Sequence, residues 1–179
     1  MHGRREPTSG AEGRNNPGAA PRALGSGLWL RPETPADQSF LKALFFTTSL
    51  AAMGLPGEAG LTLLLEAQHQ AREQSYQGAW PDARRWVIEA AGMPVGGLIE
   101  ADADAALHVI DIALAPSVRR QGVGRAVIAD LQRQAKARDL AVTAMVIVSN
   151  VASLALFRAL GFTGQAQDGE AQVQLAWRP

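Results

Sequence analysis

A turn rich in arginine and glycine carries the clearest chemical signal in this sequence. It lies between an expected strand and the start of an expected helix, and it reads Arg119, Arg120, Gln121, Gly122, Val123, Gly124 and Arg125. The first N–H groups of a helix have no partner inside it and lie at the positive end of the helix dipole, which favours an anion. Arginines are disfavoured at that end unless a polyanion binds there. The turn therefore predicts a phosphate site, with a solvated basic loop as the alternative.

Two titratable side chains on the strand before this turn are candidates for a general base. Proton removal near neutral pH is most often done by histidine or by a carboxylate, and the strand offers His108 and Asp111. Because side chains alternate along a strand, a spacing of three residues places them on opposite faces. We therefore expect at most one of them to face a cleft directly. A partly exposed histidine and a buried acid bonded to backbone donors are the structural alternatives.

Composition excludes several other chemistries. The chain has no cysteine, which removes disulfides, thiolate nucleophiles and cysteine-bound zinc. We expect no metal site, because His and Cys do not occur at metal-ligand spacing. The 17 basic and 17 acidic side chains cancel, so no overall field attracts nucleic acid or an anionic membrane. Residues 1–25 lack the apolar stretch of a secretion signal, so a cytoplasmic protein is expected.

The N-terminal residues differ in composition from the rest of the chain. We expect a flexible tail over residues 1–25 and one folded domain over residues 26–179. The tail has five glycines and three prolines, and its only large apolar residues are Met1 and Leu24. These are too few to offset the entropy lost on ordering. About 150 residues remain, enough to bury roughly 70% of the surface that the unfolded chain exposes.

Hydrophobic periodicity predicts the order of elements in the domain. Strand patterns cover residues 27–31, 85–90, 95–102, 107–114, 142–148, 162–167 and 171–177. Helical patterns cover residues 35–53, 58–77, 122–138 and 151–160. Residues 85–114 should form an antiparallel meander, and the strand, helix and strand from 107 to 148 imply a parallel pair. The order βααβββαβαββ is that of a mixed α/β (α+β) fold with a central mixed sheet and helices on both faces.

Two separate motifs make the chain resemble the GNAT superfamily of acyl-CoA-dependent N-acyltransferases. The pyrophosphate loop of that family is matched at its defining positions by Arg119, Gly122 and Gly124. A second family signature is matched by Asn150, Leu156, Gly161 and Phe162. Two positions of this signature depart from the family, because Ser153 replaces an alanine and Phe157 replaces a tyrosine. The likeness covers residues 27–178, with both motifs in the expected element order.

The resemblance implies an enzyme that transfers an acetyl group from acetyl-CoA to a primary amine while both substrates are bound. It places the pyrophosphate on the turn at 119–125 and the pantetheine between the strands that end near Leu114 and Val148. The residues expected to hold the pantetheine arm are Ile112, Ala113 and Leu114 through their backbone, with Asn150, Ser153 and Phe157 from the second motif. Besides contact with the cofactor arm, Asn150 is expected to have a structural role, which is to cap the helix that follows it. A non-catalytic acyl-CoA-binding sensor or interaction module is the alternative function.

The resemblance leaves the acid and the base of this reaction open. His108 falls where some members carry a glutamate base and is slightly favoured, whereas Asp111 lies nearer to the acyl group. Phe157 cannot donate the proton that the family's tyrosine gives to the departing thiolate. Water or Ser153 would then supply this proton, and Tyr76 is a weaker candidate. The acceptor is a small-molecule or peptide amine whose identity, like the acyl length, the sequence does not give, and a homodimer is left open.

Overall fold

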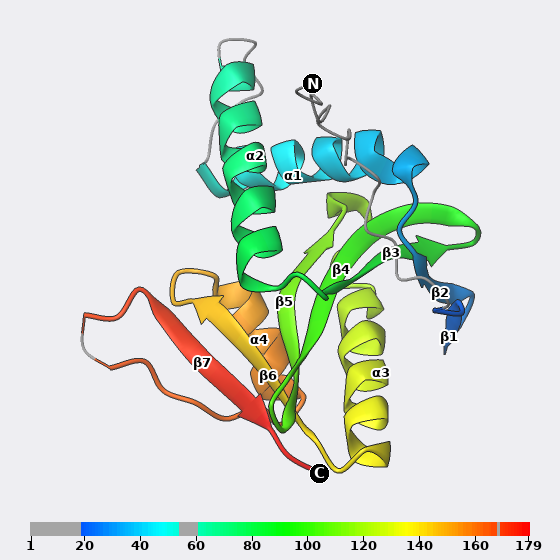
Figure 1. Cartoon of the computed structure of the whole chain (residues 1–179), viewed down its shortest axis with the longest axis vertical. Helices are drawn as coiled ribbons and strands as arrows, with labels where there is room; N and C mark the ends of the chain where they lie inside the picture. Colours follow the sequence, from blue (N-terminus) through cyan, green and yellow to red (C-terminus); the bar gives the residue numbers. More distant parts are fainter. Residues whose placement is uncertain (1–18, 54–60, 168) are drawn as a thin grey trace, which may run out of the picture.

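A seven-stranded sheet organises the chain, and helices cover both of its faces (Figure 1). The computed structural model describes residues 19–53, 61–167 and 169–179. The strands are β1 Arg22–Gly25, β2 Leu28–Pro32, β3 Arg84–Ala90, β4 Met93–Ala103, β5 Ala106–Leu114, β6 Ala141–Ile147 and β7 Gln172–Trp177. The α-helices are α1 Gln38–Met53, α2 Thr62–Ala79, α3 Val123–Ala137 and α4 Val151–Ala159. None of these described helices is long and apolar enough to span a lipid bilayer.

The strands follow one another across the sheet in sequence order, from β1 to β7. Neighbouring strands are antiparallel except β5 and β6, which are parallel and connected through α3. The predicted meander and the predicted parallel pair are therefore confirmed. Pairing between β5 and β6 extends only from Ala106 with Ala141 to Val109 with Ala144. Beyond Val109 the two strands separate, although both continue.

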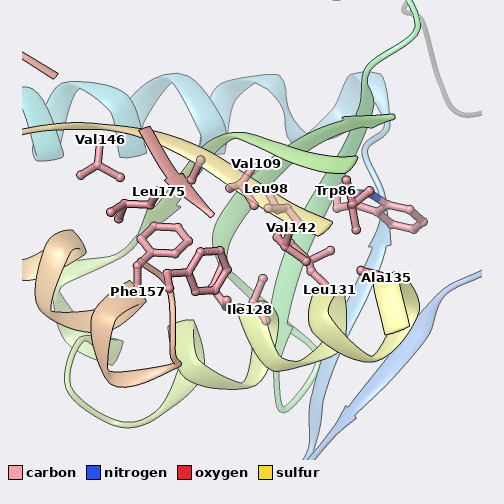
Figure 2. Close-up of a cluster of buried hydrophobic side chains, with 14 of the residues drawn as sticks. Trp86, Leu98, Val109, Ile128, Leu131, Ala135, Val142, Val146, Phe157 and Leu175 are labelled. Carbon is pink, nitrogen blue, oxygen red and sulfur yellow. The ribbon is translucent and has the colours of Figure 1, made fainter. Parts of the chain in front are cut away.

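The main hydrophobic core lies between the sheet and the helices α3 and α4 (Figure 2). The side chains of α3 that reach it recur at the spacing of one helical face. They are Val123, Val127, Ile128, Leu131 and Ala135. Phe157 of α4 is only 2% exposed and packs edge to face against Phe162, with ring centroids 4.9 Å apart. This packing fixes α3 and α4 on one face of the sheet, so their N-terminal ends are held in place.

The helices α1 and α2 cover the opposite face of the sheet. Buried residues on this side include Leu44 of α1, Leu65 of α2 and Ile99 of β4. A side-chain carbon on Gly97 would lie 3.0 Å from Leu41 Cδ2, so glycine allows α1 to lie close to β4. The two helices therefore form a wall over β4 and β5, above the strand that carries the candidate bases.

Three expectations differ from the structure. Residues 22–25, which we placed in the tail, form β1 and pair with β2. Residues 162–167 do not form a strand, since Thr163 makes only an isolated bridge with Ala176. Residues 35–37 are a 3-10 turn before α1. Residues 58–60, predicted to begin the second helix, lie outside the described residues.

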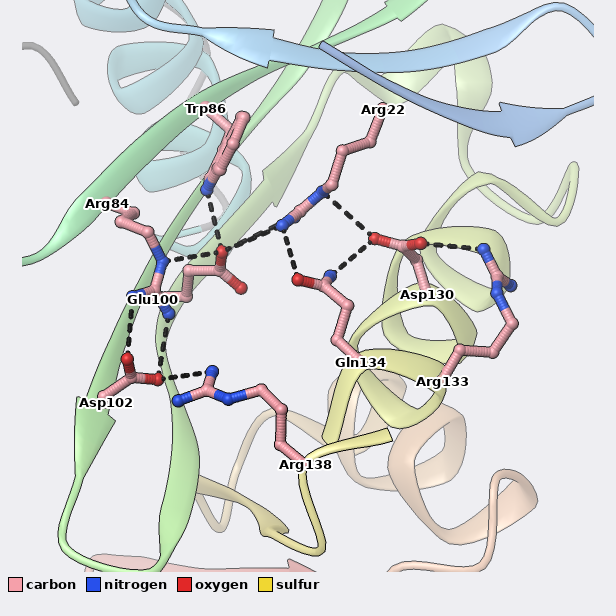
Figure 3. Close-up of polar contacts among 9 residues, drawn as sticks. All are labelled: Arg22, Arg84, Trp86, Glu100, Asp102, Asp130, Arg133, Gln134 and Arg138. Atoms are coloured by element: carbon pink, nitrogen blue, oxygen red, sulfur yellow. Dashed lines mark hydrogen bonds and ion pairs between the residues drawn. The ribbon is translucent and has the colours of Figure 1, made fainter. Parts of the chain in front are cut away.

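Arg22 joins β1 to two buried acids (Figure 3). Its guanidinium lies 3.4 Å from Glu100 Oε1 and 3.2 Å from Asp130 Oδ2, and its centre is 4.2 Å from the Trp86 ring centroid. Glu100 is 0% exposed and also accepts hydrogen bonds from Trp86 Nε1 and Arg84 Nε. A buried carboxylate is costly unless it is paired. One charged side chain therefore holds the first strand in the domain.

Replacing Arg22 with Met should lower the free energy of unfolding by about 2 to 3 kcal/mol, because Glu100 and Asp130 would lose a cation that they cannot replace with water. Urea denaturation measures this change. Arg133→Met is the matched control, since Arg133 also pairs with Asp130 but is 60% exposed, and exposed pairs contribute at most about 1 kcal/mol. Equal losses in the two variants would contradict the assigned role of Arg22.

Candidate functional site

The arginine and glycine turn leads into the N-terminus of α3 as predicted. Gly122 is the residue before the first helical turn, with φ of +84°, a conformation that other residues adopt only at a cost. Nothing lies within 4 Å of the position that its side-chain carbon would occupy. The Val123 side chain is buried in the core, and Gly124 packs against Leu156. These two residues therefore offer a ligand their backbone rather than a side chain.

The polar side chains of the turn surround this helix end. Arg119, Arg120, Gln121 and Arg125 are exposed. Arg119 Nε donates to the Leu114 carbonyl oxygen at 3.1 Å, and Gln121 Nε2 donates to the Ser117 carbonyl oxygen at 2.7 Å. These bonds tie the turn to the end of β5. Free N–H groups, the helix dipole and exposed arginines together fit a di-anionic group such as a pyrophosphate.

The backbone of β5 is available where it separates from β6. Ala115 N–H donates to the Val95 carbonyl oxygen, and in an antiparallel ladder alternate residues direct their N–H and C=O groups to opposite sides. Ile112 and Leu114 therefore direct theirs away from β4, toward the side that β6 has left. The Leu114 carbonyl oxygen is the one that Arg119 binds. Ala113, between them, belongs to the β4 side of the ladder. An extended ligand arm could add to β5 at this position.

The second motif is used mainly to build α4. Asn150 Oδ1 accepts a hydrogen bond from Ser153 N–H at 3.1 Å, so the Asn150 side chain caps this helix. Ser153 is half-buried in the first turn. Phe157 is enclosed in the core, as described above, and it contributes packing there. Contact between these three residues and a cofactor stays a prediction.

An irregularity in β5 changes the expected placement of the two candidate bases. Ile99 pairs with Asp111 but its neighbour Glu100 pairs with Val109, so Ile110 is an extra residue in β5, a β-bulge. The bulge reverses the alternation of side chains. The prediction that His108 and Asp111 lie on opposite faces is therefore wrong, since both face the side covered by α2.

Asp111 lines a pocket between α1, α2 and the sheet. Its side chain is 28% exposed, and its carboxylate lies 3.4 Å from Arg72 Nη1. Glu73, next to Arg72, binds Arg85 Nη2 at 2.6 Å. Ala113, two residues beyond Asp111, lines the same pocket. The pocket therefore meets β5 at the segment where the backbone of Ile112 is available.

His108 has a more constrained environment than Asp111. Its ring stacks on Trp80, with centroids 5.0 Å apart and an angle of 18° between the planes. Its Nδ1 is 2.8 Å from Thr143 Oγ1 on β6. Trp80 directly follows α2, so this histidine connects the end of α2 to β5 and β6. The arrangement gives His108 a clear structural role.

The environment shifts the pKa of all three candidate residues. Burial raises the pKa of Asp111, and the charge of Arg72 and the Ile112 N–H partly oppose this. Burial, followed by the charge of Asp111, raises the pKa of Tyr76 to about 12. Burial lowers the pKa of His108. Asp111 is thus a stronger base than an ordinary aspartate, and Tyr76 is a weaker acid than an ordinary tyrosine.

Residues that we did not single out in the sequence complete this pocket. They are Glu33, Arg72, Glu73 and Arg85. A signal for two of them was present, since His69, Arg72, Glu73 and Tyr76 recur at the spacing of one helical face. Among the described residues, no group of three or more His, Asp or Glu is placed to hold a metal ion.

Comparison with known proteins agrees with this architecture. The model of the acetyltransferase (GNAT) family matches residues 59–162. No curated protein sequence matches the chain. The fold is similar to that of the PaiA N-acetyltransferase from Thermoplasma acidophilum, solved in complex with coenzyme A, with 12% identity, a TM-score of 0.63 and coverage of 85% of this chain and 99% of that one.

Two further solved structures share the fold. An acetyltransferase from Thermus thermophilus is 21% identical, with a TM-score of 0.62 and coverage of 85% of this chain and 97% of that one. The putative acetyltransferase yncA from Salmonella typhimurium, solved with acetyl-CoA, is 19% identical, with a TM-score of 0.53 and coverage of 85% and 94%. Since the family model covers more than half of the chain and the order of strands and helices agrees with it, this chain belongs to the GNAT acetyltransferase family.

Proposed function

We propose that the protein transfers an acetyl group from acetyl-CoA to a primary amine by direct attack in a complex that holds both substrates. The observation that carries this proposal is the β-bulge at Ile110. It brings the Asp111 carboxylate to the short segment of β5 where the N–H and C=O groups of Ile112 and Leu114 face away from β4, next to the turn that Arg119 joins to the Leu114 carbonyl oxygen. The proposed base, oxyanion donor and anion site would thereby be adjacent.

The chain would hold the acyl donor along one line. The N–H groups that begin α3 and the arginines around Gly122 would bind the pyrophosphate. Ile112 and Leu114 would bind the pantetheine arm through their backbone, and an N–H of this segment would stabilise negative charge on the thioester oxygen. Acetyl-CoA would supply the acetyl group as a thioester. The residues present fit such a ligand, because Gly122 has no side chain and the space beside it, directly at the helix end, is open.

Asp111 is the base that the geometry favours over His108. The His108 ring is stacked on Trp80 and its Nδ1 is engaged by Thr143, whereas Asp111 lines the pocket beside Ile112 and Ala113. The amine nitrogen forms the new bond to the acetyl carbon as the carbon–sulfur bond breaks, and Asp111 accepts the amine proton. The sulfur leaves as a thiolate. The raised pKa of Asp111 suits this proton transfer.

The proton for that thiolate would come from water. Phe157 has no proton to give and is buried in the core. The pKa of Tyr76 is raised to about 12, above the value of about 8.5 that is usual for a cysteine-type thiol. A phenol of this kind remains protonated beside a thiolate. Tyr76 is therefore better suited to donate a hydrogen bond to the acceptor than to transfer a proton.

A non-catalytic acyl-CoA sensor is the second candidate, and Phe157 in place of the family's tyrosine is the observation that favours it. A thiol-release assay with acetyl-CoA and a panel of amines distinguishes the two functions. An enzyme releases coenzyme A only when an acceptor is present. A sensor binds acetyl-CoA, which calorimetry detects, and releases none with any amine.

Replacing Gly122 with Asn should weaken coenzyme A binding by about tenfold or more, because the new side chain would occupy the anion site and charge-assisted bonds would be lost. Asparagine tolerates positive φ better than other residues do, so the domain should remain folded. Titration calorimetry measures the affinity. Gly92→Asn is the matched control, with φ of +76° and open space but on the hairpin between β3 and β4. Unchanged affinity in Gly122→Asn would contradict the phosphate site.

Replacing Asp111 with Asn should lower kcat by about 10²- to 10⁴-fold, the usual contribution of a general base, and leave coenzyme A affinity unchanged. Because the base must be unprotonated, kcat of the natural protein should rise as the pH rises through the elevated pKa of Asp111. This rise should disappear in the variant. The pH dependence of kcat is the measurement, with His108→Gln as the comparison. A larger loss in His108→Gln than in Asp111→Asn would assign the base to His108.

Replacing Tyr76 with Phe should change kcat by less than about threefold, because a phenol with a pKa of about 12 is too weak an acid to protonate a thiolate near neutral pH. Steady-state kinetics at saturating acetyl-CoA measures this effect. The removal of one hydroxyl should raise KM for the acceptor more than it lowers kcat. A loss of kcat of about 100-fold would instead identify Tyr76 as the proton donor.

A further inference from the structure

The charges of the pocket beside Asp111 are already largely balanced. It is lined by three carboxylates, Glu33, Glu73 and Asp111, and by two guanidinium groups, Arg72 and Arg85. Glu33 and Glu73 bind Arg85 at 3.0 Å and 2.6 Å, and Asp111 faces Arg72. The excess is a single negative charge. A polyamine or another acceptor with several ammonium groups would need more unpaired acids than these residues provide.

Arg72 has more hydrogen-bond donors than its neighbours use. A guanidinium has five N–H groups, and those of Arg72 make two contacts, with Asp111 and with Glu73, both at 3.4 Å. Its Nε is buried and has no hydrogen-bond partner among the described residues. The group stacks 4.3 Å from the Phe45 ring centroid, and the side chain is 26% exposed. The buried Nε is closed to a ligand, but Nη1 and Nη2 make one contact each and each keeps a second N–H group for an anion, and arginine binds carboxylates with two parallel bonds.

The distances restrict the acceptor further. Arg72 Nη1 and Asp111 Oδ2 are 3.4 Å apart. An acceptor whose amine faces Asp111 and whose anion faces Arg72 must carry these two groups close together, as an α-amino acid does on one carbon. Leu41, Leu44 and Phe45 line the same pocket. They offer apolar surface rather than further polar contacts, and because the cavity volume is about 30 Å³, roughly that of one water molecule, a side chain such as that of leucine enters only if α1 and α2 move apart.

We infer that the acceptor is an apolar α-amino acid, whose carboxylate binds Arg72 while its amine is presented to Asp111. This acceptor class rests on the proposed acetyl transfer. It differs from a peptide N-terminus, where an amide replaces the carboxylate beside the amine. Binding of the carboxylate would also draw Arg72 away from Asp111, so recognition of the acceptor would free the base.

The test compares three acceptors of the same shape with the full chain and acetyl-CoA. L-Leucine carries the carboxylate, leucinamide replaces it with a neutral amide, and 3-methylbutylamine lacks it. We expect kcat/KM for leucine to exceed that for either analogue by about 10- to 100-fold, the effect of one charge-assisted hydrogen-bond pair. The amine of leucinamide is less basic than that of leucine, so a larger fraction of it is unprotonated near neutral pH. If that fraction alone set the rate, leucinamide would react faster than leucine. Equal or faster reaction of leucinamide or of spermidine would overturn the inference.

Variants of Arg72 assign the preference to this residue. Arg72→Gln removes the cation that faces Asp111, so it changes the rate with every acceptor, and it should lower kcat/KM for leucine by about 10- to 100-fold more than that for 3-methylbutylamine. Arg72→Lys keeps the charge but cannot form two parallel bonds to a carboxylate, so its kcat/KM for leucine should lie between those of the natural protein and of Arg72→Gln. Arg133→Gln, on the outer face of α3, should change neither value. A purely structural role of Arg72 would lower the rate with all acceptors equally, and that result would overturn the inference.

The outcomes separate this inference from the proposed function. If acetyl-CoA binds but no amine causes thiol release, the acetyltransferase proposal fails and the acceptor class fails with it. If leucinamide, spermidine or a peptide reacts as well as leucine does, acetyl transfer stands and only the carboxylate preference is overturned.

Discussion

One extra residue in β5 determines the geometry of the candidate site. Ile110 has no partner on β4, and three consequences follow from this. Pairing with β6 ends at Val109, the preceding residue. The side chains beyond the bulge change faces, which brings Asp111 under α2. The backbone of Ile112 and Leu114 is left without a neighbouring strand. A regular strand would have hidden this backbone in the sheet and turned the carboxylate into the core, where an unpaired charge is costly.

The position of the arginine and glycine turn at the start of α3 could be predicted from the sequence because its properties are local. Gly122 is needed where the chain takes a positive φ, and the N–H groups of α3 are free in any helix of this length. The bulge could not be predicted in this way. Ile110 is an ordinary strand residue, and its exclusion from the ladder depends on the register of β4 on both sides of it. Alternation from residue to residue therefore placed Asp111 on the wrong face.

The missed elements also depend on contacts between distant residues. Arg22–Gly25 has one large apolar residue, Leu24, so its composition indicates a tail. It becomes a strand because Arg22 meets Glu100 and Asp130, which are 78 and 108 positions later in the chain. The pocket side of α2 was missed for a related reason. The pattern of His69, Arg72, Glu73 and Tyr76 resembles a polar surface until the acids and arginines of β3, of β5 and of the segment before α1 lie opposite to it.

The two faces of the sheet use buried ion pairs in different ways. On the side of α3, Glu100 is enclosed by Arg22, Arg84 and Trp86, and the pairs serve to attach β1. On the side of α2, Arg85 forms short contacts while those of Arg72 are at 3.4 Å. The free-energy cost of desolvating a guanidinium is offset only by partners at short distance. Arg72 is half-buried and its hydrogen bonds are all at 3.4 Å, so its carboxylate partners stabilise its charge less than those of Arg85 do, and this difference is the reason for proposing that Arg72 binds an anion.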